Sequence, residues 1–204
     1  IANGRIKTFT KSTGVADGII NATTDVFFAS VDNGDGTSDP RIRYDRLSQR
    51  WFAVMISVPN GVNRILIAVS SESTISVSTV WTFFFITAQA GQFIDYPTLG
   101  IDNNALYIGT NNFVPPVYSF AGTRGYVVNK ASLLLGTATA TLFTLTPNGS
   151  TAGPYTPQGV DNLDPAATEG YFIGVDMLVF GKLVIRRVSN PGGSPTISGN
   201  LDIT

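Results

Sequence analysis

The sequence predicts an all-β fold built as a β-propeller-like series of four-stranded antiparallel blades, about three and a half in this chain. Short runs rich in Val, Ile, Phe, Tyr and Thr recur along the chain between Gly, Asn, Asp and Pro, as strands do. Few windows keep a helical period for eleven residues, and the best candidate, residues 129–135, makes one or two turns. First strands led by proline recur after 57 residues, from Pro40 to Pro97, and after 60, from Pro97 to Pro157. Four strands in a period of this length are typical of propeller blades.

Residues 1–31 are predicted to form half a blade. Asn3-Gly4 is the strongest two-residue hairpin signal, and it precedes a strand at 5–9. The apolar run at 25–31 reads as the last strand of this half blade. Because a hairpin needs a strand on both sides of its turn, we expect the chain to be a fragment or processed product. We expect its own C-terminal segment, a second copy or another polypeptide to complete the open blade.

Three whole modules follow, over residues 39–87, 95–146 and 155–204, the last one fainter than the others. In the first, the predicted strands are 39–45, 50–56, 64–69 and 81–86. In the second they are 95–102, 105–110, 125–128 and 141–145, and in the third 155–161, 170–175, 182–185 and 196–203. Trp51 and Tyr107 are predicted to occupy equivalent second-strand positions, buried between neighbouring sheets. A β-sandwich also shows strands at this spacing and stays the alternative.

The composition excludes several classes of function. Charged residues make up 13% and the net charge is −1, so the chain has no electrostatic footprint for nucleic acid. With no His and no Cys, it has neither a Ser-His-Asp system nor an ordinary zinc, copper or iron–sulfur site. No run of 18 apolar residues occurs, so no membrane insertion is expected. Oxygen ligands remain, and they suit Ca²⁺.

Several segments carry a family resemblance. Residues 38–52, 67–70, 95–100 and 111–113, in this order, resemble large secreted bacterial proteins with a sialidase-like or related β-propeller. The resemblance covers roughly residues 1–130 well and the remainder weakly. It implies a bacterial protein that is secreted or exposed at the cell surface, and it implies no particular ligand.

Three aspartates are predicted to form a ligand-binding mouth. Asp39, Asp95 and Asp161 occupy similar places in the three first strands, which line the central channel of a propeller. Converging carboxylates raise one another's pKa and are relieved by a cation or a hydrogen-bonding ligand. The alternative is that each aspartate caps its own turn beside a proline.

A second cluster resembles a calcium loop. Asp32, Asp35 and Asp39 lie in a stretch dense in Asp, Asn and Gly, although the spacing is not that of an EF-hand. Asp39 belongs to both sets, so it is the best predicted Ca²⁺ ligand. The alternative is a flexible polar turn between two blades.

The predicted function is that of a non-enzymatic binding or adhesion module with a carbohydrate or protein ligand. The alternative is a fragment of a sialidase-like or other carbohydrate-active enzyme, although the only glutamates, Glu72 and Glu169, fall in loop-like contexts. A purely structural repeat is a third reading. The aromatic side chains, Trp51 and Trp81 among them, are expected to pack between blades, with a sugar-stacking platform as the alternative.

Overall fold

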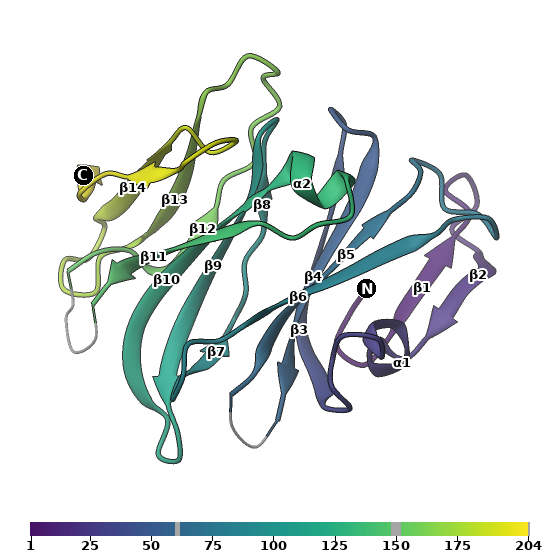
Figure 1. The fold of residues 1–204 in the computed structure, drawn as a ribbon, viewed down its shortest axis with the longest axis horizontal. Helices are drawn as coiled ribbons and strands as arrows, with labels where there is room; N and C mark the ends of the chain where they lie inside the picture. Colours follow the sequence, from purple (N-terminus) through teal and green to yellow (C-terminus); the bar gives the residue numbers. More distant parts are fainter. Residues whose placement is uncertain (60–61, 148–151, 204) are drawn as a thin grey trace.

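The structure is a computed structural model that describes residues 1–59, 62–147 and 152–203 (Figure 1). Strands take 52% of the chain and helices 5%, and every sheet is antiparallel. The predicted all-β class is therefore confirmed. No helix within the described ranges has the length and apolar character needed to cross a lipid bilayer. Residue 204, at the end of the third predicted module, lies outside the described residues.

The strands form four sheets that follow one another along the chain. The N-terminal hairpin consists of β1 (Ile6–Phe9) and β2 (Ala16–Ala22). The first sheet consists of β3 (Gly36–Asp45), β4 (Arg50–Val58), β5 (Arg64–Ser70) and β6 (Trp81–Thr87), paired in that order. The second consists of β7 (Phe93–Asp95), β8 (Gly100–Ile101), β9 (Ala105–Val114), β10 (Ser119–Asn129) and β11 (Ala140–Thr146). The third consists of β12 (Tyr155–Gly159), β13 (Glu169–Val175), β14 (Leu183–Ser189), β15 (Thr196–Ile197) and β16 (Leu201–Ile203).

Two short helices interrupt this pattern. Helix α2 (Lys130–Leu134) lies where one helical turn was predicted, and the side chain of Asn129 caps it by accepting from the Ser132 amide at 2.8 Å. Helix α1 (Thr24–Phe28) corrects the prediction of a strand at 25–31. The Thr23 hydroxyl accepts from the Val26 amide at 3.2 Å and starts the helix, and burial of Phe28 holds it. An apolar run this short fits either structure, and the cap together with tertiary burial selected the helix.

The sheets stack face to face in chain order, with an apolar layer in each joint. Phe28 and Val31 pack with Met55 and Leu66 against one face of the first sheet. The opposite face of that sheet packs on the second sheet, and the second packs on the third. Each sheet of the stack is therefore held by side chains from its neighbours. Figure 1 shows the strands from β1 to β14 fanned out across the molecule.

The predicted equivalence of Trp51 and Tyr107 is wrong by one residue. Tyr107 is fully buried between the second and third sheets, whereas Trp51 is half-buried on the face of the first sheet toward the N-terminal hairpin. Phe52 faces the next sheet as Tyr107 does. Because successive side chains of a strand point to opposite faces, a slip of one residue moves a side chain to the other joint.

Glycines set the close approach of the second and third sheets. A Cβ on Gly170 would lie 1.9 Å from Cζ of Tyr107, and one on Gly159 would lie 2.0 Å from the Tyr107 carbonyl oxygen. No side chain fits at these separations. The third sheet can therefore pack on the second only because both positions are glycine.

The first strand region of each sheet contains the same backbone feature. Asp39, Tyr96 and Thr156 each precede a proline and each has a positive φ, of 56°, 52° and 48°. The pairing register shifts at this feature in β3 and in β12. Non-glycine residues seldom adopt this conformation. Its recurrence before three prolines therefore indicates the same local backbone structure in all three sheets.

Candidate functional site

A groove lies between the N-terminal hairpin and the first sheet, and we call it the N-terminal groove. Its volume is about 890 Å³, within the usual range of ligand sites. Ten of its lining residues are apolar or aromatic, namely Ile1, Ile6, Phe9, Ile19, Ile20, Ile42, Tyr44, Trp51, Ile75 and Trp81. Seven are polar, namely Lys7, Thr8, Thr10, Lys11, Asp17, Ser73 and Thr74.

The groove follows strand β1. Six consecutive residues, 6–11, line it, so the backbone of the strand as well as its side chains borders the hollow. Within the described ranges β1 pairs with β2 alone, which leaves its other edge without a strand neighbour. The predicted turn at Asn3-Gly4 precedes this edge, with Ala2 and Arg5 exchanging backbone hydrogen bonds of 3.0 and 3.1 Å. An unpaired edge exposes N–H and C=O groups that can bind another strand.

Three aromatic side chains, Tyr44, Trp51 and Trp81, form the aromatic floor of the groove. The rings of Tyr44 and Trp51 lie 5.1 Å apart across β3 and β4, and 38% of the Tyr44 surface is exposed. The Trp51 indole N–H donates to the Ser73 carbonyl at 2.9 Å, which orients its ring. The Trp81 indole nitrogen is buried and has no hydrogen-bond partner in the structure. Buried indole N–H groups usually have an acceptor, so the floor has an unused donor.

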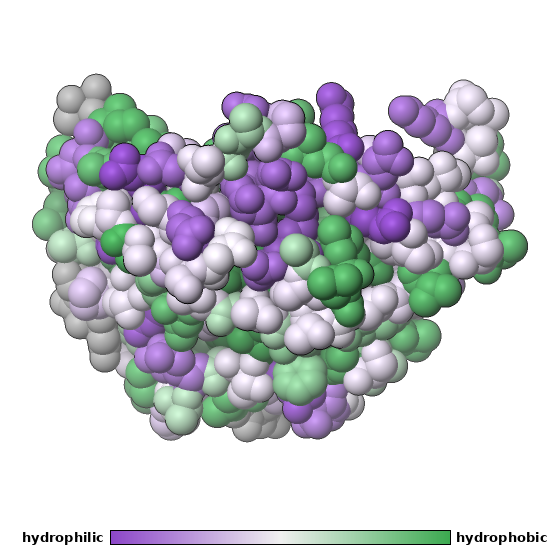
Figure 2. Space-filling view, turned by 45° about the horizontal axis from the view of Figure 1, so that its top comes forward, coloured by the Kyte–Doolittle hydropathy of each residue, from purple (hydrophilic) through white to green (hydrophobic). Residues whose placement is uncertain are grey.

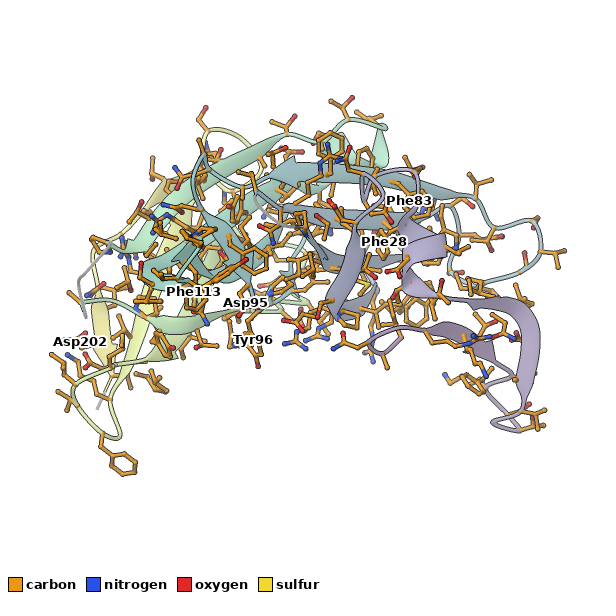
Figure 3. The ribbon with its side chains drawn as sticks, turned by 90° about the horizontal axis from the view of Figure 1, so that it is seen from below. Phe28, Phe83, Asp95, Tyr96, Phe113 and Asp202 are labelled. Atoms are coloured by element: carbon orange, nitrogen blue, oxygen red, sulfur yellow. The ribbon has the colours of Figure 1, made fainter. Side chains whose placement is uncertain are left out.

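A second layer of aromatic rings supports the floor. Phe27 of helix α1 contacts Trp81 edge-on at 5.2 Å, and it contacts Phe83 at the same distance. Phe28 and Phe83 lie 5.7 Å apart, and Figure 3 shows the two together beside the first sheet. Helix α1 therefore fixes the floor from behind.

Ser73, Thr74 and Ile75 line one wall of the groove, and Glu72 organises the segment 71–80 that contains them. Its carboxylate accepts from the hydroxyl groups of Thr79 at 2.7 Å, Ser76 at 3.0 Å and Ser78 at 3.4 Å. These hydrogen bonds lower the pKa of Glu72, with Thr79 and Ser76 contributing most. Glu72 is therefore a structural acceptor, and it is ionised at neutral pH.

The rim of the groove is polar and carries a positive balance. Lys7 and Lys11 face a single lining carboxylate, that of Asp17. The Thr8 hydroxyl donates to Asp17 and, together with the Ile19 amide, lowers the pKa of that carboxyl. The rim thus favours ligands with acidic or hydrogen-bond-accepting groups.

Of the three aspartates predicted to form a ligand-binding mouth, the structure brings two together. Burial raises the pKa of Asp95, and the neighbouring carboxyl of Asp39 raises it further, so both groups lie in one place. The Tyr96 ring beside them lies 4.9 Å from the Arg41 guanidinium (Figure 3). Asp161 lies elsewhere: its carboxylate accepts from the Ile101 amide at 2.9 Å and pairs with Arg43 at 3.1 Å.

The position of Asp161 has a simple geometric reason. It follows Pro157 by four residues, whereas Asp39 and Asp95 precede their prolines. It therefore stands at the far end of its first strand, roughly 13 Å away at about 3.3 Å per residue. Counting from each proline would have placed Asp161 with Asp45 and Asp102 instead.

The predicted calcium loop is held by its own backbone. Asp32 is buried, and its carboxylate accepts from the Gly34 amide at 2.8 Å. The Asp35 amide donates to the Asp32 carbonyl. In the ranges that the structure describes, no three His, Cys, Asp or Glu side chains are grouped for a metal ion, so Asp32, Asp35 and Asp39 stand apart. Calcium binding stays a prediction.

A smaller pocket of about 180 Å³ contains two carboxylates, those of Asp45 and Asp161. Both have structural partners, since Lys130 binds Asp45 at 2.8 Å and Arg43 binds Asp161. Although burial opposes it, the hydrogen bonds from Lys130 and Ser48 lower the pKa of Asp45. A general acid of glycoside hydrolysis needs the opposite shift, so this pocket gives the carbohydrate-active enzyme alternative no support.

The sequence reasoning missed the groove, although it singled out both tryptophans. It assigned them to packing between blades, because the face toward which each ring points depends on register. The hairpin side chains Thr8 and Asp17 gave no recognisable signal.

Comparison of the chain with protein-family models, curated proteins and solved structures finds no match.

Proposed function

We propose that this chain is a non-enzymatic binding module that takes an extended polypeptide segment into the N-terminal groove, where the segment adds a strand to β1. The observation that carries this proposal is that an 890 Å³ groove runs along an unpaired strand edge. In strand addition, main-chain hydrogen bonds supply affinity and alternate side chains supply specificity. The module provides both elements at one place.

The lining favours a polypeptide over a sugar. Apolar and aromatic residues outnumber polar ones by ten to seven, and isoleucines supply six of the ten. Alternate apolar side chains of a bound strand would cover these surfaces, and acidic side chains would face Lys7 and Lys11. The partly exposed pair of Tyr44 and Trp51 favours a carbohydrate as the second candidate, because sugar rings stack on such surfaces.

The finer architecture belongs to the same proposal. A propeller-like arrangement of about three and a half blades is supported by the face-to-face stacking of the sheets in chain order and by the repeated positive-φ residue before Pro40, Pro97 and Pro157. In this arrangement the N-terminal hairpin is half a blade, and a strand added to β1 extends it. A secreted or cell-surface location fits a surface low in charge, 13% of residues, and rich in hydroxyl groups.

Intrinsic fluorescence tests the proposal directly, because both tryptophans of the chain line the groove. The probe is a synthetic peptide of alternating Val and Thr with glutamates at its ends. The control peptide is the same except for proline at one odd and one even position. These prolines remove one N–H donor from each edge of the extended peptide. We expect the first peptide to shift the emission and the proline peptide to leave it unchanged.

Two protein variants localise the effect. Phe9→Asp places a charge in the groove, at a side chain that is 55% exposed, and should abolish the shift. Val26→Asp changes a comparably exposed side chain outside the groove and should retain it. Equal responses to both peptides would overturn strand addition. A response to a soluble cello-oligosaccharide instead would establish the carbohydrate candidate.

A further inference from the structure

The third sheet ends in an open edge like that of β1. Strands β15 and β16 lie one after the other along the same side of β14. Neither has a strand neighbour on its outer side within the described ranges. All three residues of β16 are exposed. Near each end of the stack, the described part of the chain therefore has a short strand with one unpaired edge, β1 and β16.

The outer face of the third sheet is apolar. Val175, Leu183 and Ile203 are paired in register across three strands, and so are Ile173, Ile185 and Leu201. The opposite face of this sheet packs on the second sheet through Phe172 and Val188. Leu201 and Ile203 are 44% and 47% exposed, and Phe180 in the adjoining turn is fully exposed. A contiguous apolar surface of this kind marks an interaction site.

The two ends of the stack carry opposite charge. Residues 1–22 have three basic side chains and one acidic one, a net charge of +2. Residues 155–203 have three basic and five acidic side chains, a net charge of −2. Hydrophobic residues also reach the surface toward both ends of the face in Figure 2. The ends are therefore complementary in charge and alike in apolar character.

We propose that the occupant of the N-terminal groove is the third sheet of a second copy of this chain, joined head to tail. Strand β16 of one copy pairs with β1 of the next, and the apolar outer face of the third sheet covers the aromatic floor. This rests on the proposed function and names its partner. The contact repeats the face-to-face packing that already joins the sheets within one chain.

The side-chain pattern of the two strands supports this pairing. An antiparallel register places Ile6 opposite Ile203, Thr8 opposite Leu201, and Lys7 opposite Asp202, whose carboxylate also pairs with Lys182 of its own sheet at 2.9 Å. Ile6 is buried on the groove side, so both apolar residues of β16 face the floor. Opposite charges and apolar pairs directly across strands both stabilise a sheet.

One chain cannot make this contact with itself. In Figure 3, Asp202 of β16 lies at one end of the molecule, and Phe28, behind the groove floor, lies toward the other. Figure 1 likewise shows β14 and β1 on opposite sides of the stack. A head-to-tail contact between different surfaces closes into a ring or continues as a filament.

Sedimentation velocity with complementary variants tests the inference. Leu201→Asp blocks the outer face of the third sheet, and Phe9→Asp blocks the groove. Leu135→Asp is the control, because this side chain is 85% exposed and belongs to neither of the two surfaces. The unchanged chain and Leu135→Asp should associate as concentration rises. Leu201→Asp and Phe9→Asp should each weaken association by about 100-fold, because each buries an unpaired charge.

The mixture of the two blocked variants is decisive. Each retains one intact surface, so together they should form a one-to-one dimer and nothing larger. A monomeric unchanged chain at every concentration would overturn the inference, and so would a mixture that stays monomeric. The Val–Thr peptide titration repeated on Leu201→Asp reports separately on the groove. If the peptide binds but the unchanged chain does not self-associate, this inference alone is overturned. If the peptide does not bind, the proposed function is overturned.

Discussion

Lys130 forms a buried ion pair that ties the first sheet to the second. Its ammonium group donates to Asp45 at 2.8 Å and to the Asp102 carbonyl at 2.5 Å. The two side chains of the pair are 4% and 2% exposed. Replacing Lys130 by Met keeps most of the apolar stem and removes the charge together with both hydrogen bonds, so the variant tests the whole contribution of the ammonium group.

The expected loss is large because the carboxylate stays behind. Asp45 still accepts from the Leu47 and Ser48 amides and from the Ser48 hydroxyl, yet it remains a buried charge without a counterion. Breaking such a pair costs about 3–5 kcal/mol of unfolding free energy. A domain of about 150–250 residues loses about 2–4 °C of Tm per kcal/mol, so the melting temperature should fall by roughly 6–20 °C.

The pH dependence identifies the cause. In the unchanged chain, Lys130 and Ser48 overcome the effect of burial and lower the pKa of Asp45, so its contribution to stability is present at neutral pH and is lost as the pH falls. Without Lys130, only the hydrogen bonds from Ser48 and Leu47 oppose the effect of burial, so the pKa of Asp45 should rise, and protonation relieves the unpaired charge. The stability difference between the two proteins should therefore shrink as the pH is lowered.

Denaturant unfolding at neutral and acidic pH measures both effects. Lys11→Met is the matched control, because Lys11 is exposed, and it should change stability little. The double variant with Asp45→Asn should recover part of the loss, since no buried charge remains. If Lys130→Met unfolds with the free energy of the unchanged chain at neutral pH, the ion pair does not hold the two sheets together as argued.

Four other predictions follow from single contacts. Gly170→Ala would place its Cβ 1.9 Å from Tyr107 and should destabilise the chain by several kcal/mol or prevent folding, which circular dichroism melts would show. Tyr107→Phe removes a 2.6 Å hydrogen bond to Asp102 and should cost about 1.5–3 kcal/mol in chemical unfolding. The buried Tyr126 hydroxyl has no hydrogen-bond partner, and its burial raises the pKa of Tyr126 to about 12. Tyr126→Phe removes this hydroxyl, so the variant should be as stable as the unchanged chain or more stable. Protonation of Glu72 as the pH falls through its lowered pKa should reduce the hydrogen-exchange protection of residues 71–80, taken relative to the intrinsic exchange rate at each pH. Glu72→Gln should reduce it already at neutral pH, and unchanged protection in both experiments would refute the role of Glu72 in the groove wall.

Features that depend on neighbouring residues could be predicted from the sequence. Period-two runs of branched and aromatic residues predicted the strands, and the all-β class is confirmed. Asn3-Gly4 predicted a turn, and Ala2 and Arg5 pair across it. Residues 129–135 predicted the one turn of α2. Turn chemistry and side-chain alternation are set by contacts within a few residues, so a pattern can show them.

The tertiary structure alone decided which face each side chain joins and which residues meet. A slip of one position put Trp51 on the floor of the groove instead of in the joint that buries Tyr107. Asp161 lies at the far end of its strand, beside Arg43, because four residues separate it from its proline. The groove itself arises from the separation between the hairpin and the first sheet. These features depend on register and on the stacking of residues distant in sequence, and no local pattern contains that information.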